Sequence, residues 1–333
     1  MNQDQLRDFY RDRTVLVTGG AGFIGSHLVE RLVEFGAQVR VLARYNSAGS
    51  IGHLSELGHP SGALDIRLGD IADSDYVARC MDGIDTVFHL AALIGIPYSY
   101  VAPGHYVSTN VTGTLAVLEA TRRWGTRRVV HTSTSETFGS AQYVPMDELH
   151  PLVAQSPYAA TKVAADQLAL SYFRSFETPV VVLRPFNTFG PRQSMRAVIP
   201  TVIQQLLVGP ELEIGSTTPV RDLNPVANTV DGFLRCGAVP DIEGELFVVG
   251  SGTGHTIGET VETIGQLLGV EPLIREAAER TRPTASEVNR LICDYSKASR
   301  VLGYAPETSF EDGLSAAISY CRSHPSNRLS YAI

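Results

Sequence analysis

Short runs of apolar, often β-branched residues recur along the first half of the chain, and amphipathic segments separate them. The runs occupy residues 14–18, 38–43, 64–68, 86–90, 128–132 and 179–183. Strands that alternate with helices in this way predict a parallel sheet wrapped by helices. Because the runs are so apolar, both faces of the sheet must be covered, which predicts a doubly wound α/β fold. Ligands are then expected beyond the carboxyl ends of the strands.

The pattern changes after Arg184, where prolines and glycines break the chain into short, irregular pieces. One more strand-like run, residues 245–249, is expected to return to the sheet. The second lobe should therefore be smaller and discontinuous, with loops that border a substrate cleft. We assign residues 1–185 and 226–255 to the sheet domain, and residues 186–225 and 256–333 to the substrate-binding lobe.

The composition is that of an ordinary globular protein, with 44% hydrophobic and 19% charged residues in a chain of 333. A formal net charge of -8 offers no basic field for a phosphate backbone, so no nucleic-acid partner is expected. No apolar run reaches the roughly 18 residues of a membrane span, and a cytoplasmic location is expected. The four cysteines are widely spaced, without a metal-binding or redox pattern.

A glycine-rich turn directly follows the first strand. Residues 18–25 read TGGAGFIG and open an amphipathic helix. Glycines permit a tight turn and let the backbone approach a pyrophosphate, whose charge meets the amino end of the helix. The turn therefore predicts a dinucleotide cofactor, with contacts from Gly19, Gly22, Phe23, Ile24 and Gly25.

The ends of the next strands supply further cofactor candidates. The second strand ends at Arg44, where an NAD-specific site usually has an acidic residue; we expect NAD, and Arg44 on the 2'-phosphate of NADP is the alternative. Asp70 and Ile71 follow the third strand, and Asp70 can meet the adenine amine or cap the next helix. After the fourth strand, the segment with Leu90, Ala91 and Ala92 is expected beside the cofactor.

Tyr158 and Lys162 lie four residues apart, hence on one face of a predicted helix. A nearby ammonium and a positive nicotinamide ring both favour the phenolate, so Tyr158 can take the proton of a sugar hydroxyl while its hydride leaves. The pair follows a glycine turn and a strand that ends in Ser133 and Thr134. This combination predicts an oxidoreductase-type active site.

With these motifs in this order, the chain resembles the extended short-chain dehydrogenase/reductases of the NAD-dependent epimerase/dehydratase type, over nearly its whole length. The resemblance implies a Rossmann domain with a small carboxyl-terminal lobe for a nucleotide sugar. It also implies that Thr134 bonds the hydroxyl on sugar carbon 4, that Tyr158 is the base and that Lys162 holds the nicotinamide ribose. Asn110 matches the family asparagine that supports the active site, and a helix cap is its alternative.

Other segments resemble those of sugar-nucleotide dehydratases. The R-P-x-N segment at residues 184–187 implies that Asn187 meets the substrate diphosphate and that Pro185 lies beside the cofactor. Arg221 resembles a phosphate-binding arginine, and Arg282 and Glu287 resemble the segment that closes over the nucleotide. Residues 91–100, 132–136 and 186–200 resemble UDP-N-acetylglucosamine dehydratases of the legionaminic acid type, in particular 5,6-dehydratases of tunicamycin biosynthesis. This resemblance adds Pro97, Tyr98, Arg196 and Val198 as substrate contacts.

The motif at the end of the fifth strand indicates the reaction. Dehydratases of the family carry Thr-Asp-Glu where this chain has Thr134, Ser135 and Glu136. Glu136 can remove the proton on carbon 5 once carbon 4 is oxidised and so drive water loss from carbon 6, whereas an epimerase needs no such base. Ser135 replaces the expected acid, and Phe138 replaces a usual tyrosine.

We therefore expect an NAD-dependent enzyme that dehydrates UDP-N-acetylglucosamine and returns the hydride to carbon 4, giving a 5,6-alkene. The alternatives are a 4,6-dehydratase with a 4-keto-6-deoxy product, a 4-epimerase, and a catalytically silent regulator on the same fold. The helices expected at residues 103–124 and 157–176 resemble the family's dimer-forming pair, so a homodimer is expected.

Overall fold

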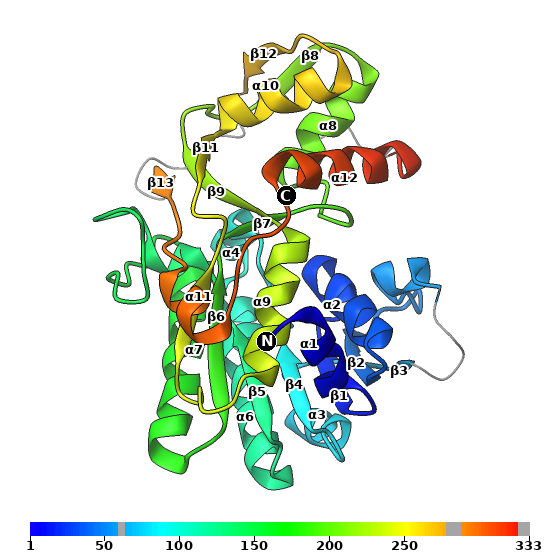
Figure 1. The fold of residues 1–333 in the computed structure, drawn as a ribbon, viewed down its shortest axis with the longest axis vertical. Coiled ribbons are helices and arrows are strands. Elements are labelled where there is room, and N and C mark those ends of the chain that lie inside the picture. Colours follow the sequence, from blue (N-terminus) through cyan, green and yellow to red (C-terminus); the bar gives the residue numbers. More distant parts are fainter. Residues whose placement is uncertain (59–63, 278–287, 326–333) are drawn as a thin grey trace.

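A parallel sheet of seven strands forms the centre of the protein, of which the computed structural model describes residues 1–58, 64–277 and 288–325 (Figure 1). Its strand order is β10-β6-β5-β4-β1-β2-β3. The strands are β1 (Thr14–Thr18), β2 (Gln38–Arg44), β3 (Leu64–Gly69), β4 (Thr86–His89), β5 (Arg128–Thr132), β6 (Val180–Pro185) and β10 (Leu246–Val249). The order reverses between β1 and β4, the switch point at which such sheets bind ligands. The predicted doubly wound fold, including the late returning strand, is confirmed.

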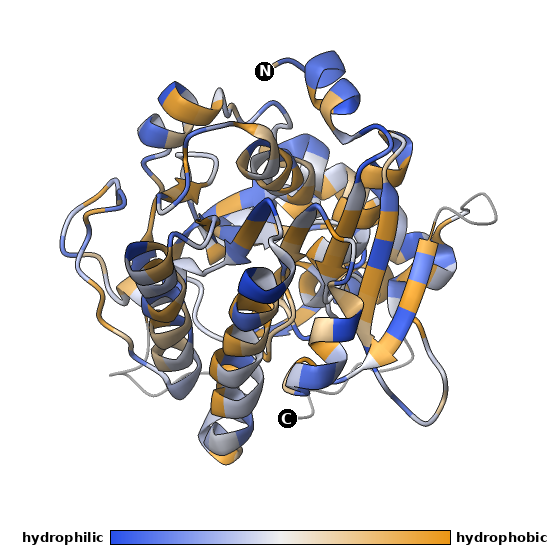
Figure 2. Cartoon of the chain, turned by 90° about the horizontal axis from the view of Figure 1, so that it is seen from below, coloured by the Kyte–Doolittle hydropathy of each residue, from blue (hydrophilic) through white to orange (hydrophobic). Residues whose placement is uncertain are grey.

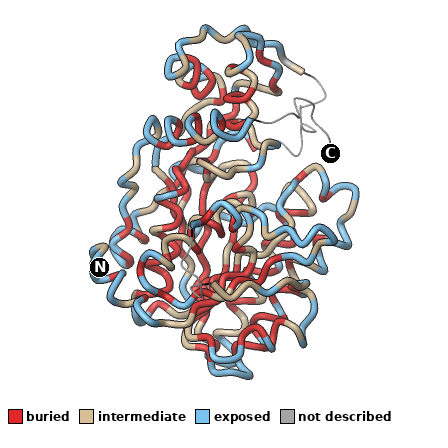
Figure 3. The backbone as a smooth tube through the Cα atoms, turned by 90° about the vertical axis from the view of Figure 1, so that its right-hand side faces the viewer, coloured by how far each residue is buried: buried red, intermediate tan, exposed pale blue. Residues whose placement is uncertain are grey.

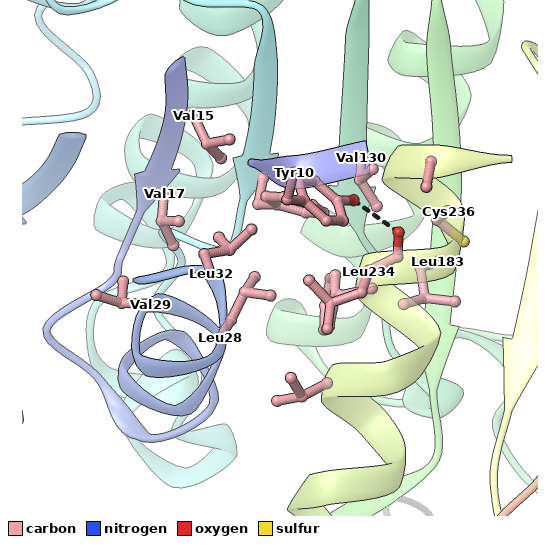
Figure 4. Packing of buried hydrophobic residues seen from close by; sticks show 14 of the residues in the cluster. Tyr10, Val15, Val17, Leu28, Val29, Leu32, Val130, Leu183, Leu234 and Cys236 are labelled. Carbon is pink, nitrogen blue, oxygen red and sulfur yellow. Dashed lines mark hydrogen bonds between the residues drawn. The ribbon is translucent and has the colours of Figure 1, made fainter. Parts of the chain in front are cut away.

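Helices cover both faces of this sheet, because strands this apolar cannot face water (Figure 2). One face is covered by α1 (Gln3–Tyr10), α2 (Phe23–Glu34), α9 (Val226–Ala238) and α11 (Ser296–Leu302). The other is covered by α3 (Ser74–Cys80), α6 (Gly113–Trp124) and α7 (Pro157–Phe176). Figure 4 shows the first interface, where the buried Tyr10 hydroxyl donates to the Leu234 carbonyl oxygen at 2.6 Å.

A second, smaller core lies above the sheet in Figure 1. Its strands are β7 (Asn187–Phe189), β8 (Glu211–Ile214), β9 (Val220–Pro225), β11 (Gly254–Thr256), β12 (Leu273–Glu276) and β13 (Arg290–Leu291), and its helices are α8 (Val198–Val208), α10 (Ile257–Leu268) and α12 (Phe310–Ser323). Between β9 and β11 the chain returns to the sheet as α9 and β10. This part is therefore discontinuous, and the exact domain boundaries stay a prediction. Buried residues concentrate along the sheet and inside this second core (Figure 3).

Short helices lie in the connections that follow the strands. They are η1 (Gly52–Glu56) between β2 and β3, then α4 (Ile96–Val101), α5 (Pro103–Tyr106) and the π-helical turn η2 (Val107–Thr112) between β4 and β5, and η3 (Ser135–Phe138) after β5. The helix expected at residues 103–124 is thus α5 and α6 joined through η2, and π-helical turns often mark functional sites. Within the described residues, no helix has the length and apolar character needed to cross a membrane.

Polar contacts join the second core to the first turns of α2. The Arg192 guanidinium lies 2.9 Å from a Glu30 carboxylate oxygen, and the His27 ring contacts the Pro191 carbonyl oxygen at 2.9 Å. On α12, the Tyr320 hydroxyl donates to Glu56 of η1 at 3.1 Å. The loops that follow the sheet are therefore tied to the helix that begins at the glycine turn.

Candidate active site

The glycine turn exposes backbone to an approaching phosphate, because a side chain at Gly19 or Gly25 would collide with the chain itself. Gly19 has φ 72°, and a Cβ there would lie 2.8 Å from the Ala91 nitrogen. A Cβ on Gly25 would lie 2.4 Å from the Gly19 carbonyl oxygen. Gly22 is the N-cap of α2 and has no side chain to satisfy the first helical N–H groups. Together with Phe23 and Ile24 in the first turn, this arrangement fits the pyrophosphate of a dinucleotide.

The segments after β2 and β3 lie at the same edge of the sheet. Arg44 ends β2 opposite Gly69 of β3, and its side chain is exposed. Asp70 is exposed and accepts a hydrogen bond from the Ala72 N–H at 2.9 Å, and Ile71 is buried. The N-cap of α3 is Asp73, so the alternative that Asp70 caps this helix is wrong. Contact of Asp70 with the adenine stays a prediction.

The segment after β4 lies directly against the glycine turn. The Ala91 N–H donates to the Thr18 hydroxyl at 3.2 Å, and the same hydroxyl lies 2.8 Å from His89 Nδ1. Leu90 and Ala92 are half-buried here. These contacts hold the ends of β1 and β4 together. The predicted cofactor residues that follow the two strands therefore lie close to one another.

Tyr158, Thr134 and Glu136 meet at the start of α7. Thr134 is the N-cap of η3, where its hydroxyl accepts from the Glu136 N–H at 3.3 Å, and it also hydrogen-bonds Tyr158. Burial raises the pKa of Tyr158, the Thr134 hydrogen bond lowers it, and the Glu136 carboxylate raises it through its charge. The Tyr158 side chain is 7% exposed and lies edge-on to Tyr106, with ring centroids 6.3 Å apart. A phenol and a carboxylate therefore share one small site.

Lys162 lies one turn after Tyr158 but is directed toward the sheet. Its Nζ donates to the Thr132 carbonyl oxygen at 2.5 Å, and the side chain is 4% exposed. Burial lowers the pKa of Lys162 to about 8, and the Asp166 carboxylate opposes this effect. The largest influences on the pKa of Tyr158 are its burial and the Thr134 hydrogen bond, so the expected direct effect of the ammonium on the phenol is not dominant.

Asn110 supports the site through protein contacts and does not cap a helix. Its amide oxygen accepts from the Leu93 N–H at 2.8 Å, and its amide nitrogen donates to the Leu93 carbonyl oxygen at 3.0 Å and to the Thr161 hydroxyl at 3.0 Å. The side chain is 1% exposed. Asn110 thus joins the segment after β4 to the catalytic helix, and direct cofactor contact stays a prediction.

A buried polar group beneath the site was missed by the sequence analysis. Asp166 accepts from Ser133 Oγ at 2.5 Å and from Arg184 Nη2 at 2.9 Å, and lies 3.1 Å from His131 Nε2. The Arg184 guanidinium lies 4.4 Å from the centre of the Phe138 ring. Asp166 follows Lys162 by four residues, so the helical spacing already placed it on the catalytic face.

The predicted substrate contacts are spread over several elements. Pro97 and Tyr98 lie on α4, where Tyr98 packs against Tyr106, with ring centroids 6.0 Å apart. Pro185 is buried at the end of β6, and Asn187 begins β7 with a buried amide oxygen that has no partner among the described residues.

The remaining predicted contacts belong to the second core. Arg196 is exposed before α8, Val198 is its first residue, and Arg221 is buried on β9. Arg282 and Glu287 lie outside the described residues. The sheet thus brings together the predicted catalytic residues, whereas a common diphosphate site for these arginines stays a prediction.

Comparisons with known proteins agree with this arrangement. A profile of the family described as GDP-mannose 4,6 dehydratase matches residues 16–317. A dTDP-glucose 4,6-dehydratase from Actinoplanes sp. is 35% identical over 321 residues, covering 94% of this chain and 98% of that protein.

Two solved structures are similar over most of their length. DesIV, a dTDP-glucose 4,6-dehydratase from Streptomyces venezuelae with NAD bound, has a TM-score of 0.84 at 32% identity and covers 93% of this chain and 97% of its own. A UDP-N-acetylglucosamine 4-epimerase from Methanobrevibacter ruminantium has a TM-score of 0.85 at 28% identity, over 94% and 99%. The chain therefore belongs to the GDP-mannose 4,6 dehydratase family, a group of NAD-dependent epimerases and dehydratases.

Proposed function

We propose that the protein is an NAD-dependent dehydratase of UDP-N-acetylglucosamine that forms a 5,6-alkene and returns the hydride to carbon 4. The observation that carries dehydration is the Glu136 carboxylate beside Tyr158, at the end of the strand that presents Thr134. The glycine turn fits NAD, and the NAD-bound DesIV supports this cofactor. The solved UDP-N-acetylglucosamine 4-epimerase supports a UDP-N-acetylhexosamine as the substrate class.

The first step needs a proton acceptor for the hydroxyl on carbon 4. Thr134 hydrogen-bonds Tyr158 and can orient the sugar hydroxyl, while Tyr158 accepts its proton. NAD, when bound, supplies the hydride acceptor and a positive ring that favours the Tyr158 phenolate. Lys162 holds the nicotinamide ribose in this proposal, from its place one turn along α7.

Elimination then needs a base near carbon 5. A ketone at carbon 4 acidifies the proton on carbon 5, and Glu136 can remove it as the hydroxyl leaves carbon 6. Ser135 is buried and a poor acid at neutral pH, so Glu136 itself is the best available proton donor to the leaving group. Phe138 packs against Arg184 in the core, so the change from tyrosine at that position is not part of this proposal.

The product depends on which carbon receives the hydride in the last step. Reduction of the carbon 4 ketone reverses the first step, with Tyr158 as the acid, and leaves the 5,6-alkene. The second candidate is a 4,6-dehydratase, which delivers hydride to carbon 6 and a proton to carbon 5, and the names of the relatives from Actinoplanes and Streptomyces favour it. A 4-epimerase is the third, but it has no use for the Glu136 base.

A substrate labelled with deuterium at carbon 4 separates these candidates. We expect NMR of the product to show vinyl signals, with the label retained on carbon 4. Label in a carbon 6 methyl group would establish the 4,6-dehydratase instead, and a product without loss of water would establish an epimerase. Glu136→Gln should stop water loss, while reversible hydride transfer between carbon 4 and NAD continues. Dehydration by Glu136→Gln at the native rate would show that Glu136 is not the base.

We also propose that the protein is a homodimer built on α6 and α7. The two helices pack against each other and leave Leu115 and Phe176 exposed at 37% and 50%. Apolar side chains of this size on adjacent helices suit a contact with a second copy. Light scattering should give twice the 36.0 kDa of one chain, and a monomer at micromolar concentration would refute the dimer.

A further inference from the structure

Asp166 is a fully buried carboxylate one helical turn beyond Lys162, and the proposed chemistry does not use it. A buried carboxylate is costly unless hydrogen bonds and opposite charges satisfy it. Both of its oxygens have partners: Oδ1 lies 3.1 Å from His131 Nε2, and Oδ2 accepts from Ser133 Oγ at 2.5 Å and from Arg184 Nη2 at 2.9 Å. The partners come from β6 and from the end of β5.

These contacts hold the strand end that carries Thr134. Asp166 binds His131 and Ser133, and Lys162 binds the carbonyl oxygen of Thr132 between them at 2.5 Å. Three consecutive residues at the end of β5, residues 131–133, are therefore fixed to one face of α7. Thr134 is the next residue, so its distance from Tyr158 depends on this attachment.

The same carboxylate balances the charges below the site. Asp166 interacts with His131 on β5, Arg184 on β6, and Lys162 and Tyr158 on α7. Farther out, His89 on β4 faces His131 and Lys162, and Glu136 on η3 faces Tyr158. Burial alone would raise the pKa of Asp166, but the His131 hydrogen bond and the Arg184 and Lys162 charges hold it well below its ordinary value. Asp166 is thus an anion, and its charge counteracts the effect of burial on the pKa of Lys162.

We propose that Asp166 is a positioning residue of this active site, which seats the end of β5 against the catalytic helix and places a negative charge one helical turn from Lys162. The inference rests on the proposed roles of Thr134, Tyr158 and Lys162. Arg184, in the R-P-x-N segment, belongs to the same buried cluster.

The sequence makes a direct test possible, because Lys162 and Lys297 are the only two lysines of the chain. Protein labelled with [ε-13C]lysine should give two Cε resonances, and Lys297→Arg assigns them. Lys297 pairs with Glu245 at 2.7 Å on a distant surface and serves as the internal reference. We expect the wild-type Lys162 resonance to titrate near pH 8.

In Asp166→Asn, the carboxylate charge is lost while the side chain keeps its size. The Lys162 midpoint should move to lower pH by about one pH unit or more, since a neighbouring opposite charge typically shifts a titration by that amount. A Lys162 midpoint equal to that of the wild type in a folded Asp166→Asn protein would overturn the charge role.

Asp166→Glu and Ser133→Ala test the seating role separately. Both keep the negative charge, so the Lys162 midpoint should stay within about 0.3 pH units of the wild type, while turnover falls about tenfold or more because the end of β5 is displaced. Native turnover in Asp166→Glu would overturn the seating role, even if Asp166→Asn fails to fold. The lysine titration needs no substrate, so a failure of the proposed dehydration leaves that result readable.

Discussion

The cofactor-binding end of the active site is formed mainly by backbone, and the catalytic end is formed by side chains. At the cofactor end, Gly19, Gly22 and Gly25 form a surface of backbone, and an added side chain at Gly19 or Gly25 would collide with the chain itself. At the catalytic end, Tyr158 and Lys162 are side chains, and other buried side chains fix their surroundings. The cofactor end should therefore be disrupted by substitutions that add a side chain, and the catalytic end by substitutions that remove one.

The two regions also differ in how far apart along the sequence their interacting residues lie. The glycine turn depends on a few consecutive residues, whereas the catalytic end depends on pairs such as Asn110 with Thr161 and Ser133 with Asp166, which are 51 and 33 residues apart. A change in the turn should therefore act on cofactor retention. A change in the distributed network should act on turnover or stability.

The largest effect is expected where the side chain is itself the reacting group. Tyr158→Phe removes the proton acceptor and little volume, so turnover should fall about 10³-fold while the cofactor stays bound. Product formation by NMR, with retained nucleotide measured after denaturation, checks both parts. Tyr172→Phe is the matched control, because this tyrosine lies on the same helix and its hydroxyl bonds Glu119 on the surface. Turnover within about threefold of the wild type in Tyr158→Phe would exclude the assigned base.

The sequence predicted what is local and missed what is distributed. Apolar runs and the TGGAGFIG turn were enough for the sheet and the cofactor end, because the strand period and the glycine spacing are properties of neighbouring residues. The four-residue spacing likewise placed Tyr158 and Lys162 on one helical face. The partners of Asn110 and the direction of the Lys162 ammonium toward Thr132 depend on how β4, β5 and α7 pack, which no short motif records.

The second expected effect tests the backbone-built end by adding one methyl group. Gly25→Ala places a Cβ 2.4 Å from the Gly19 carbonyl oxygen and 2.8 Å from the Gly20 Cα, so the turn must shift. We expect the dissociation rate of NAD to rise at least about tenfold and the free energy of unfolding to fall by about 1–3 kcal/mol. The release of NAD is followed by the fluorescence gained when added NADH takes its place in the site.

Gly104→Ala is the control for this change, because Gly104 also lies in a helix and an added Cβ there meets no atom of the described residues within 4 Å. It should leave cofactor release unchanged. If Gly25→Ala holds NAD as tightly as the wild type, the close approach of backbone at this turn does not limit the site.

A smaller effect is expected from the residue that joins the two ends. Asn110→Ala leaves the Leu93 N–H and carbonyl groups without their buried partner, which should cost about 2–4 kcal/mol of unfolding free energy. Urea unfolding measures this cost, and Asn289→Ala, at an exposed position, should change stability by less than about 0.5 kcal/mol. A loss of cofactor without a loss of stability would instead favour direct contact of Asn110 with NAD.

The smallest effect is expected at Arg44, a side chain at the otherwise backbone-built end. Arg44 is exposed at the end of β2, and an NAD site offers it no 2'-phosphate to bind. Arg44→Ala should therefore change the NAD dissociation rate by less than about threefold, since an exposed charge contributes little.

A cycle that returns its own hydride has no need to exchange cofactor, so the purified protein should carry NAD(H). Denaturation followed by an enzymatic assay of the released nucleotide identifies it. If NADP is recovered from the wild type but not from Arg44→Ala, Arg44 binds the 2'-phosphate. Cofactor binding at this end would then depend on one side chain as well as on backbone.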